Sequence, residues 1–278
     1  MSIFSSADVA TFQADRLLQA ANSLAPDNKP SATFLLNQIQ AAEAEVSHQL
    51  RVFLEPTRVF PIPPTSDMLA TLESVSAGDE PGAAPNTPMP WVDDPANDYD
   101  PTFFRGDNWG YITLRRRPVV KVNTINFVYP APGMSFYTVP SDWIRLDKRA
   151  AHIQLVPASA AFTAPLNAFL MAAMGGGMTI PYMIQVDYVA GLQNVRSDPR
   201  WADLVDVILK KAVLKVVEGW YLPQSSSISA DGLSQSISVD CSKYRDLIDL
   251  TLFGPKGSNG GLFTAIHGLT LGVLGSLG

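Results

Sequence analysis

The sequence predicts an α+β protein: a helical bundle of two N-terminal and two C-terminal helices, with an inserted β-rich region and an extended C-terminal arm. Helical periodicity dominates both ends of the chain, whereas alternating apolar and polar residues are typical of its middle. Residues 183–221 join the two patterns, because a strand-like stretch at 184–189 is followed by a glycine turn and then by the longest amphipathic helix pattern in the sequence.

This central helix pattern begins at Asp198, whose side-chain oxygen can cap a helix, and Pro199 occupies the first helical position. Apolar residues then recur at helical spacing for about six turns. A stripe this broad must be buried against other elements. The predicted bundle core on this helix is Trp201, Leu204, Ile208, Val213, Val216 and Trp220.

Residues 1–56 predict a helical hairpin that packs on the central helix. Ser5 or Ser6 can cap a first helix that runs to about Leu24, and Ser31 can cap a second helix that ends at Pro56. The second helix carries an apolar face made of Leu35, Ile39, Ala42, Val46, Leu50 and Phe53.

Residues 57–190 predict the β-rich region with long loops. An extended segment at 58–62 is followed by a Pro-, Gly- and Asp-rich stretch at 77–100, which we expect to be an exposed loop. Residues 158–178 are small, apolar and end in three glycines, which indicates a flexible segment. Strand patterns occur at 110–117, 119–129, 136–139, 143–146 and 152–156.

Residues 191–253 predict the rest of the bundle: the central helix, a β-hairpin and a final helix. Asp231-Gly232 between alternating residues is a hairpin signal. Asp240 can cap the final helix, and Gly254 followed by Pro255 stops it. Its expected inward residues are Tyr244, Leu247, Ile248 and Leu252.

The remaining residues, 254–278, predict a glycine-rich arm that does not fold by itself, because glycine is costly to order. Such a segment can become ordered on a partner. We therefore expect an assembly arm that contacts a partner protein or a neighbouring subunit through Leu262, Phe263, Ile266, Leu269, Leu271 and Leu274.

Composition narrows the classes of function. The chain has 278 residues, a net charge of −6 and a single cysteine, so an intramolecular disulfide is impossible. An acidic chain is a poor partner for sequestering DNA, which requires clustered Lys and Arg. No apolar run reaches the length of a membrane span, and residues 1–15 lack the features of a secretory signal.

Residues that could carry chemistry are scattered. His48, His152 and His267 lie far apart without metal-ligand spacing, and Cys241 has no motif around it. The acidic group at Asp93, Asp94, Asp98 and Asp100 lacks the pattern of a calcium loop. The only basic cluster, 115–117, indicates a solvated sheet face or a subunit salt bridge rather than a nucleic-acid site. We therefore expect no enzyme activity, no metal and no cofactor.

Four segments, taken in order, give a family resemblance. The first is a pair of helices that ends in 54–57 (LEPT), and the second is the stretch 117–122 (RPVVKV) followed by an Ile-x-Phe-Val-Tyr strand. The third is the stretch 186–191 (VDYVAG), which is followed by Pro199 and a long helix ending near 218–220. The fourth is the stretch 231–236 (DGLSQS), which leads into a short helix. In this order the chain resembles the head–tail connector (adaptor) proteins of tailed bacteriophages over most of 31–253.

The resemblance implies a structural virion protein of the neck, between capsid and tail, that is assembled in the host cytoplasm. It implies a ring, commonly of twelve copies, that docks beneath the portal protein and presents its lower surface to tail or neck proteins. Genomic DNA would pass through the channel without sequence-specific binding, and an acidic lumen would repel its phosphates.

Two alternatives stay open at this point. One is another ring component of a phage tail end or baseplate, which would differ only in its position in the particle. The other is a carbohydrate-binding or hydrolytic β-domain, which needs paired carboxylates in a cleft lined by aromatic residues. Asp142, Trp143 and Trp109 are the nearest candidates for that cleft.

Overall fold

A computed structural model describes residues 2–24, 29–74, 89–104, 110–128, 135–156, 179–220, 225–230, 233–238, 241–255 and 260–268. It is an α+β protein, as predicted. The chain divides into two compact units: Met1–Arg51 together with Val195–Gly278 form the helical unit, and Val52–Asn194 form the sheet unit. Outside the described residues lie the segment 158–178, Asp231-Gly232, Asp240 and the arm residues Leu269, Leu271 and Leu274.

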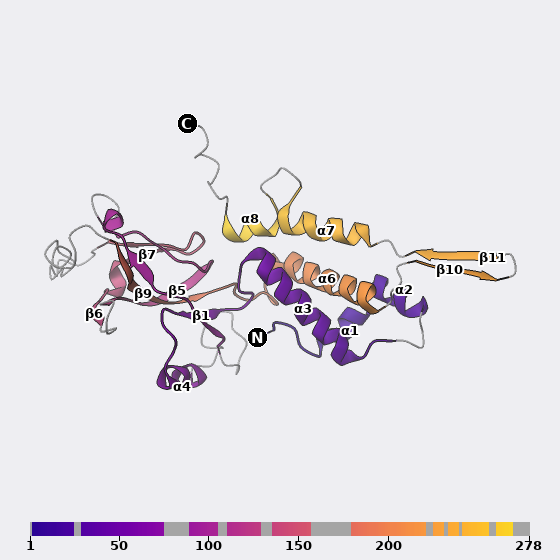
Figure 1. Ribbon diagram of the computed structural model, residues 1–278, viewed down its shortest axis with the longest axis horizontal. Coiled ribbons are helices and arrows are strands. Elements are labelled where there is room, and N and C mark those ends of the chain that lie inside the picture. Colours follow the sequence, from indigo (N-terminus) through magenta and orange to yellow (C-terminus); the bar gives the residue numbers. More distant parts are fainter. Residues whose placement is uncertain are drawn as a thin grey trace, which may run out of the picture. The chain divides into compact units, whose positions relative to one another are not determined.

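The helical unit is built on three long helices that lie side by side (Figure 1). Its elements are α1 (Asp8–Gln13), α2 (Arg16–Leu24), α3 (Ala32–Leu50), the 3₁₀ turn η5 (Pro199–Trp201), α6 (Ala202–Trp220), β10 (Ser225–Ala230), β11 (Leu233–Ser238), α7 (Ser242–Phe253) and α8 (Gly261–His267).

Contacts between side chains fix the direction of each long helix. The rings of Phe34 on α3 and Trp220 on α6 lie 4.7 Å apart, whereas Lys211 near the middle of α6 pairs with Glu45 near the end of α3 at 2.8 Å. These contacts make α6 antiparallel to α3. An ion pair between Arg245 and Glu218 places the start of α7 at the end of α6, so α7 returns along it.

The apolar stripe of α6 lies inside this unit. Leu204, Ile208, Val213 and Val216 are buried, and Trp201 and Trp220 are half-buried. On α3 the buried apolar residues are Leu35, Ile39, Ala42, Val46 and Leu50. The 3.6-residue period therefore explains how these two helices pack.

Local capping chemistry corrects the predicted helix boundaries. The first helix is broken into α1 and α2 because the Asp15 carboxylate accepts a hydrogen bond from the Leu17 N–H at 2.8 Å and starts a new helix. Ser31 caps α3 as expected, by accepting from the Phe34 N–H at 3.2 Å. That helix ends at Leu50 and not at Pro56, because Arg51 adopts a left-handed conformation with φ of 54°.

The C-terminal part of this unit differs from the prediction in two ways. Leu247 of α7 is 41% exposed and does not face inward, unlike Ile248 and Leu252. In addition, the predicted arm contains α8, which packs on α7 and buries Leu262 and Ile266. The expectation that this segment has no fold of its own is wrong for 261–267.

The sheet unit contains a large sheet of strand order β2-β1-β9-β5-β6, in which β3 also pairs with β9, and a second sheet of order β4-β8-β7. The bounds are β1 (Thr57–Phe60), α4 (Ser66–Ser74), β2 (Trp91–Asp93), β3 (Asn97–Tyr99), η2 (Pro101–Phe104), β4 (Ile112–Thr113), β5 (Val119–Val128), β6 (Ser135–Thr138), η4 (Ser141–Trp143), β7 (Ile144–Asp147), β8 (His152–Leu155) and β9 (Ile180–Ala190).

Strand β9 is the centre of the large sheet. It pairs antiparallel with β5 along most of its length and with β1 and β3 on its other side. The alternation at 184–189 predicts a strand with one buried face, but both Asp187 and Tyr188 are buried. The main apolar core includes Ile125, Phe127, Trp143, Ile153, Met183, Ile184 and Val186.

Several sheet-unit elements were not predicted. Strands β2 and β3 lie inside the stretch 77–100 that we expected to be a loop, and helix α4 has no counterpart in the prediction. Conversely, the strand predicted at 110–117 consists only of β4, which pairs with β8 through Ile112 and Thr113. Short strands of this kind are specified by distant partners, so local periodicity indicates them poorly.

Candidate interaction surfaces

The three histidines occupy separate places. His48 is exposed on α3, His152 of β8 packs on the ring of Tyr111 at 4.9 Å, and His267 is buried on α8 with Nε2 2.6 Å from the carbonyl oxygen of Leu50. Cys241 is buried at the start of α7. Within the described part of the chain, no group of three or more His, Cys, Asp or Glu side chains could hold a metal ion.

The acidic residues between 93 and 100 serve separate structural contacts. Asp98 accepts a hydrogen bond from the Tyr182 N–H at 2.9 Å. Asp100 accepts from the hydroxyl and the N–H of Thr102 at 2.7 and 2.9 Å, which hold the pKa of its carboxyl below the ordinary value. Asp98 therefore links β3 to β9, whereas Asp100 stabilises the local turn at Thr102.

The basic cluster pairs with an acidic residue of the same unit. Arg116 Nε and Arg115 Nη1 lie 3.1 and 3.5 Å from the carboxylate of Asp94. The Arg116 guanidinium also lies 5.5 Å from the centre of the Phe53 ring, a cation–π distance. Two arginines of the cluster thus already have an acidic partner in their own chain, which is a different arrangement from the expected subunit salt bridge.

A buried ion pair holds the three central strands of the large sheet. Arg58 of β1 binds Asp187 of β9 through Nε at 3.1 Å and through Nη2 at 2.7 Å. Asn123 of β5 donates a third hydrogen bond to the same carboxylate at 2.9 Å. Because Asp187 is only 9% exposed, these donors take the place of the water that would otherwise bind its carboxylate.

The hydroxyl of Tyr188 supports the loop before β5. It accepts a hydrogen bond from the Arg116 N–H at 3.2 Å. Burial raises the pKa of Tyr188 to about 12. A phenol with so high a pKa stays protonated and neutral near pH 7, which suits a structural role rather than proton transfer.

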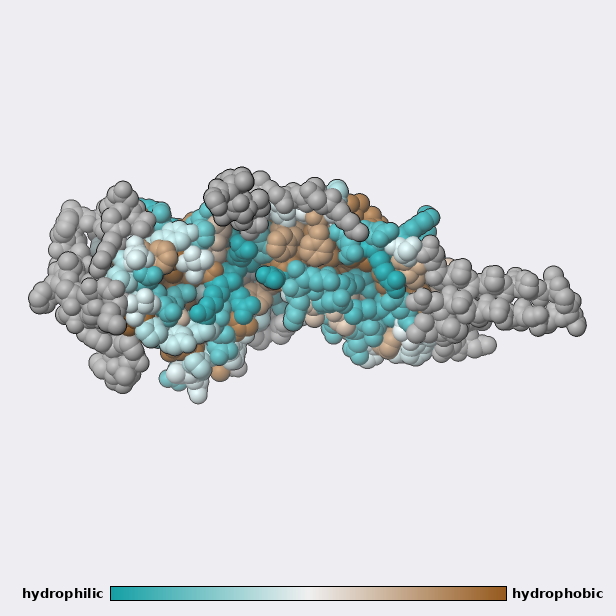
Figure 2. Space-filling model, turned by 45° about the horizontal axis from the view of Figure 1, so that its top comes forward, coloured by the Kyte–Doolittle hydropathy of each residue, from teal (hydrophilic) through white to brown (hydrophobic). Residues whose placement is uncertain are grey.

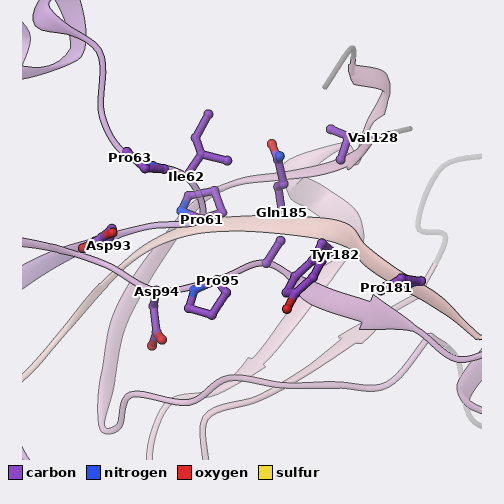
Figure 3. Close-up of a pocket in the computed structure, with 11 residues that line it drawn as sticks. Pro61, Ile62, Pro63, Asp93, Asp94, Pro95, Val128, Pro181, Tyr182 and Gln185 are labelled. Carbon is purple, nitrogen blue, oxygen red and sulfur yellow. The ribbon is translucent and has the colours of Figure 1, made fainter. Parts of the chain in front are cut away.

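The sheet unit carries a groove of about 460 Å³ where β1 and β2 end beside the start of β9 (Figure 3). Tyr182 at its wall is 59% exposed and has a φ of 56°, a conformation that is uncommon for a residue other than glycine. The lining is dominated by proline and apolar side chains, including Pro61, Ile62, Pro63, Pro95, Pro181 and Tyr182.

The groove provides shape but no evident reaction chemistry. Of its two acidic lining residues, Asp94 is engaged by two arginines, and Asp93 is exposed. Of the aromatic residues considered for the hydrolytic alternative, Trp143 is buried in the core and cannot stack on a sugar. Trp109 lies outside the described residues.

A further surface lies on α7. Leu247, Leu250 and Phe253 are 41%, 48% and 43% exposed, on the side opposite the buried Ile248 and Leu252. Figure 2 shows hydrophobic atoms gathered on this part of the helical unit. The sequence carried a signal for this face, because apolar residues at 247, 248, 250, 252 and 253 cannot all point to one side of a helix.

The hairpin β10–β11 is a two-stranded sheet by itself. Its register pairs Ser225 with Ser238 and Ala230 with Leu233, as the Asp-Gly signal predicts. Within the described residues, neither strand pairs with a third one. Neither strand contains a charged residue or a proline, which are the usual means of blocking an exposed edge.

Comparisons with known proteins show only distant likeness. No family model matches the sequence, and no curated protein matches it. One similar solved chain belongs to a structure described as "Neck of empty GTA particle computed with C6 symmetry", with 15% identity, a TM-score of 0.36 and coverage of 90% of this chain and 91% of that chain. Another belongs to "Virion of native gene transfer agent (GTA) particle", with 16% identity, a TM-score of 0.37 and coverage of 86% and 89%.

The described helices do not meet the requirements of a membrane-spanning helix. None of them combines the length and the hydrophobicity that a bilayer crossing requires.

Proposed function

We propose that this protein is a structural component of a phage-type virion neck, a head–tail adaptor that assembles into a ring beneath the portal and joins the capsid to the tail. The observation that carries the proposal is the hairpin β10–β11, whose two uncharged strands pair with no third strand among the described residues. Two-stranded hairpins are marginally stable alone, so such edges are suited to pairing with another chain.

Edges on both sides of one hairpin favour repeated head-to-tail association. A heterologous contact of this kind closes into a ring when its rotation closes. Two of the segments that carry the family resemblance also meet in the fold, since Val119 of the 117–122 segment pairs with Ala190 of the 186–191 segment. The proposed ring has about twelve copies, contacts portal and tail proteins, and conducts DNA through an acidic lumen without reading its sequence.

Electron microscopy and native mass spectrometry of the purified protein test this function, both alone and with a purified portal protein. Rings, or a ring docked on the portal, are expected. Ile237→Lys places a charge in β11 and should reduce ring formation, whereas the matched Ile237→Val should not. A protein that stays monomeric alone and also with the portal would contradict the proposal. Docking at the distal end of the tail would identify the other ring component instead.

A further inference from the structure

The outer face of α7 is a continuous apolar surface that is exposed to solvent. Leu247, Leu250 and Phe253 span six residues of helix, which is about 9 Å along the axis. Nearly half of each side chain is exposed, and they form one stripe rather than separate spots. Large apolar stripes on soluble proteins mark sites of contact with other chains.

Residues 269–278 are a suitable occupant by composition. They contain Leu269, Leu271, Val273, Leu274 and Leu277 and no charged residue. Lys243 and Asp246, one of each sign, flank the apolar stripe on the same side of α7. An uncharged segment can pass both without leaving a charge unpaired in the contact.

The position of α8 determines where this segment starts. Phe263 of α8 packs 6.4 Å from Phe253 of α7, and the other end of α8 is held where His267 Nε2 lies 2.6 Å from the carbonyl oxygen of Leu50. Ten residues reach about 33 Å when extended, which is several times the length of the stripe. The segment is therefore long enough to cover the stripe on a neighbouring chain.

The direction of α8 favours a neighbouring copy over the same chain. Figure 1 shows α8 continuing beyond the C-terminal end of α7, so that its own last turn lies farthest from the start of α7. To reach Leu247 of its own helix, the chain would have to reverse directly after Gly268. The α7 stripe of a second copy can be reached without this reversal of the chain.

We propose that the outer face of α7 is a socket that receives residues 269–278 of a second copy of this chain. This inference rests on the proposed function, because it names a second contact, beside the hairpin edges, by which adjacent subunits of the ring hold one another. The socket and the arm are different segments of the chain, so the contact is heterologous and each copy uses both.

Disulfide trapping between full-length chains tests the socket. One chain carries Leu250→Cys and the other Leu271→Cys, both in a Cys241→Ser background. Oxidation of the mixture should give a linked heterodimer in a yield about tenfold above a control with Asp203→Cys, an exposed site on α6, because docking raises the effective concentration of the thiols. A yield equal to that of the control would overturn the proposal.

A chain with both Leu250→Cys and Leu271→Cys separates the two possible sources of the arm. At high dilution it should remain unlinked, whereas an internal disulfide would show that the arm covers its own helix and would contradict the proposal. Leu250→Asp should abolish ring formation without changing the helical circular dichroism. Normal rings from Leu250→Asp would overturn the socket and leave the proposed function intact, whereas absence of rings from the unmodified protein would contradict the proposed function itself.

Discussion

The helical unit and the sheet unit differ in where they leave large apolar side chains exposed. In the sheet unit, Ile62 and Tyr182 line the groove, whereas Trp91 and Phe103 lie on two other segments. In the helical unit, the exposed large apolar residues among those described all belong to α7, where they form one face. Scattered exposed residues are normal on any protein, but a continuous face indicates a contact surface. The helical unit therefore offers one apolar helix face for the proposed contact, whereas the sheet unit offers a groove and two separate side chains.

The two units also differ in how they use charge. The sheet unit places a buried ion pair, Arg58 with Asp187, across its central strands. In the helical unit, surface ion pairs link α6 to a neighbouring helix, as Lys211 and Lys215 do with Glu45 of α3. We therefore expect charge removal to cost more in the sheet unit than in the helical unit.

The largest expected effect contrasts the inner and outer faces of the helical unit. Ile208→Ala removes a fully buried side chain from α6 and should lower the free energy of unfolding by about 2–5 kcal/mol, because it leaves a cavity. Leu250→Ala on the outer face of α7 should change it by less than about 0.5 kcal/mol in the free subunit. Urea unfolding of both variants measures the contrast, and equal losses would show that α7 is not exposed there.

The second prediction concerns the buried ion pair of the sheet unit. Arg58→Ala leaves the Asp187 carboxylate with fewer donors and should destabilise the protein by about 3 kcal/mol. Arg115→Ala removes an exposed cation 3.5 Å from Asp94 and should cost no more than about 1 kcal/mol. Thermal unfolding of the two variants provides the comparison. A small loss for Arg58→Ala would mean that water replaces the guanidinium.

Local sequence predicted the helical unit better than the sheet unit for a physical reason. The buried faces of α3 and α6 follow from the 3.6-residue period, which needs no knowledge of partners. Strands β2 and β3 form by pairing with β1 and β9, which lie far away in the sequence. The Pro- and Asp-rich stretch that contains them has no local strand pattern, so the sequence predicts a loop there. The groove beside Tyr182 depends on the same long-range pairing, and no local pattern indicates it.

Some errors in the helical unit come from competing local signals. By sequence, Asp15 fits the polar face of one continuous amphipathic helix, but in the structure it caps the start of α2. Leu247 fits an inward position by period, yet Ile248 and Leu252 define the buried face of α7 more closely. The many glycines of 254–278 obscured the short helix α8.

The third prediction uses two glycines in different settings. Gly191, at the end of β9, has a φ of 127°, and a Cβ there would lie 2.4 Å from the carbonyl oxygen of Glu55. Gly191→Ala should therefore cost at least about 1–3 kcal/mol. Gly219 lies in α6 with open space around it, so Gly219→Ala should stabilise the protein by up to about 1 kcal/mol. Melting temperatures that shift in the same direction would contradict this assignment.

The smallest expected effect concerns Glu45, which joins α3 to α6. Burial pulls the pKa of its carboxyl upward, but the ammonium groups of Lys211 and Lys215, each 2.8 Å away, outweigh burial and hold the pKa below the ordinary value of 4.5. A carboxyl whose pKa is lowered by folding adds stability above its unfolded pKa, and this stability is lost as the pH falls through the folded value.

Glu45→Gln should accordingly be less stable than the unmodified protein at pH 7, by about 0.2–1 kcal/mol because the pair is partly exposed. The difference should shrink as the pH falls below 4.5 and vanish once the carboxyl is protonated in both states. Urea unfolding of both proteins at pH 7 and at pH 3 measures it, with Asp203→Asn as the control for an exposed carboxylate on α6. A difference that stays constant across this range would show that the side chain of Glu45 stabilises α3 and α6 by packing and not by its charge.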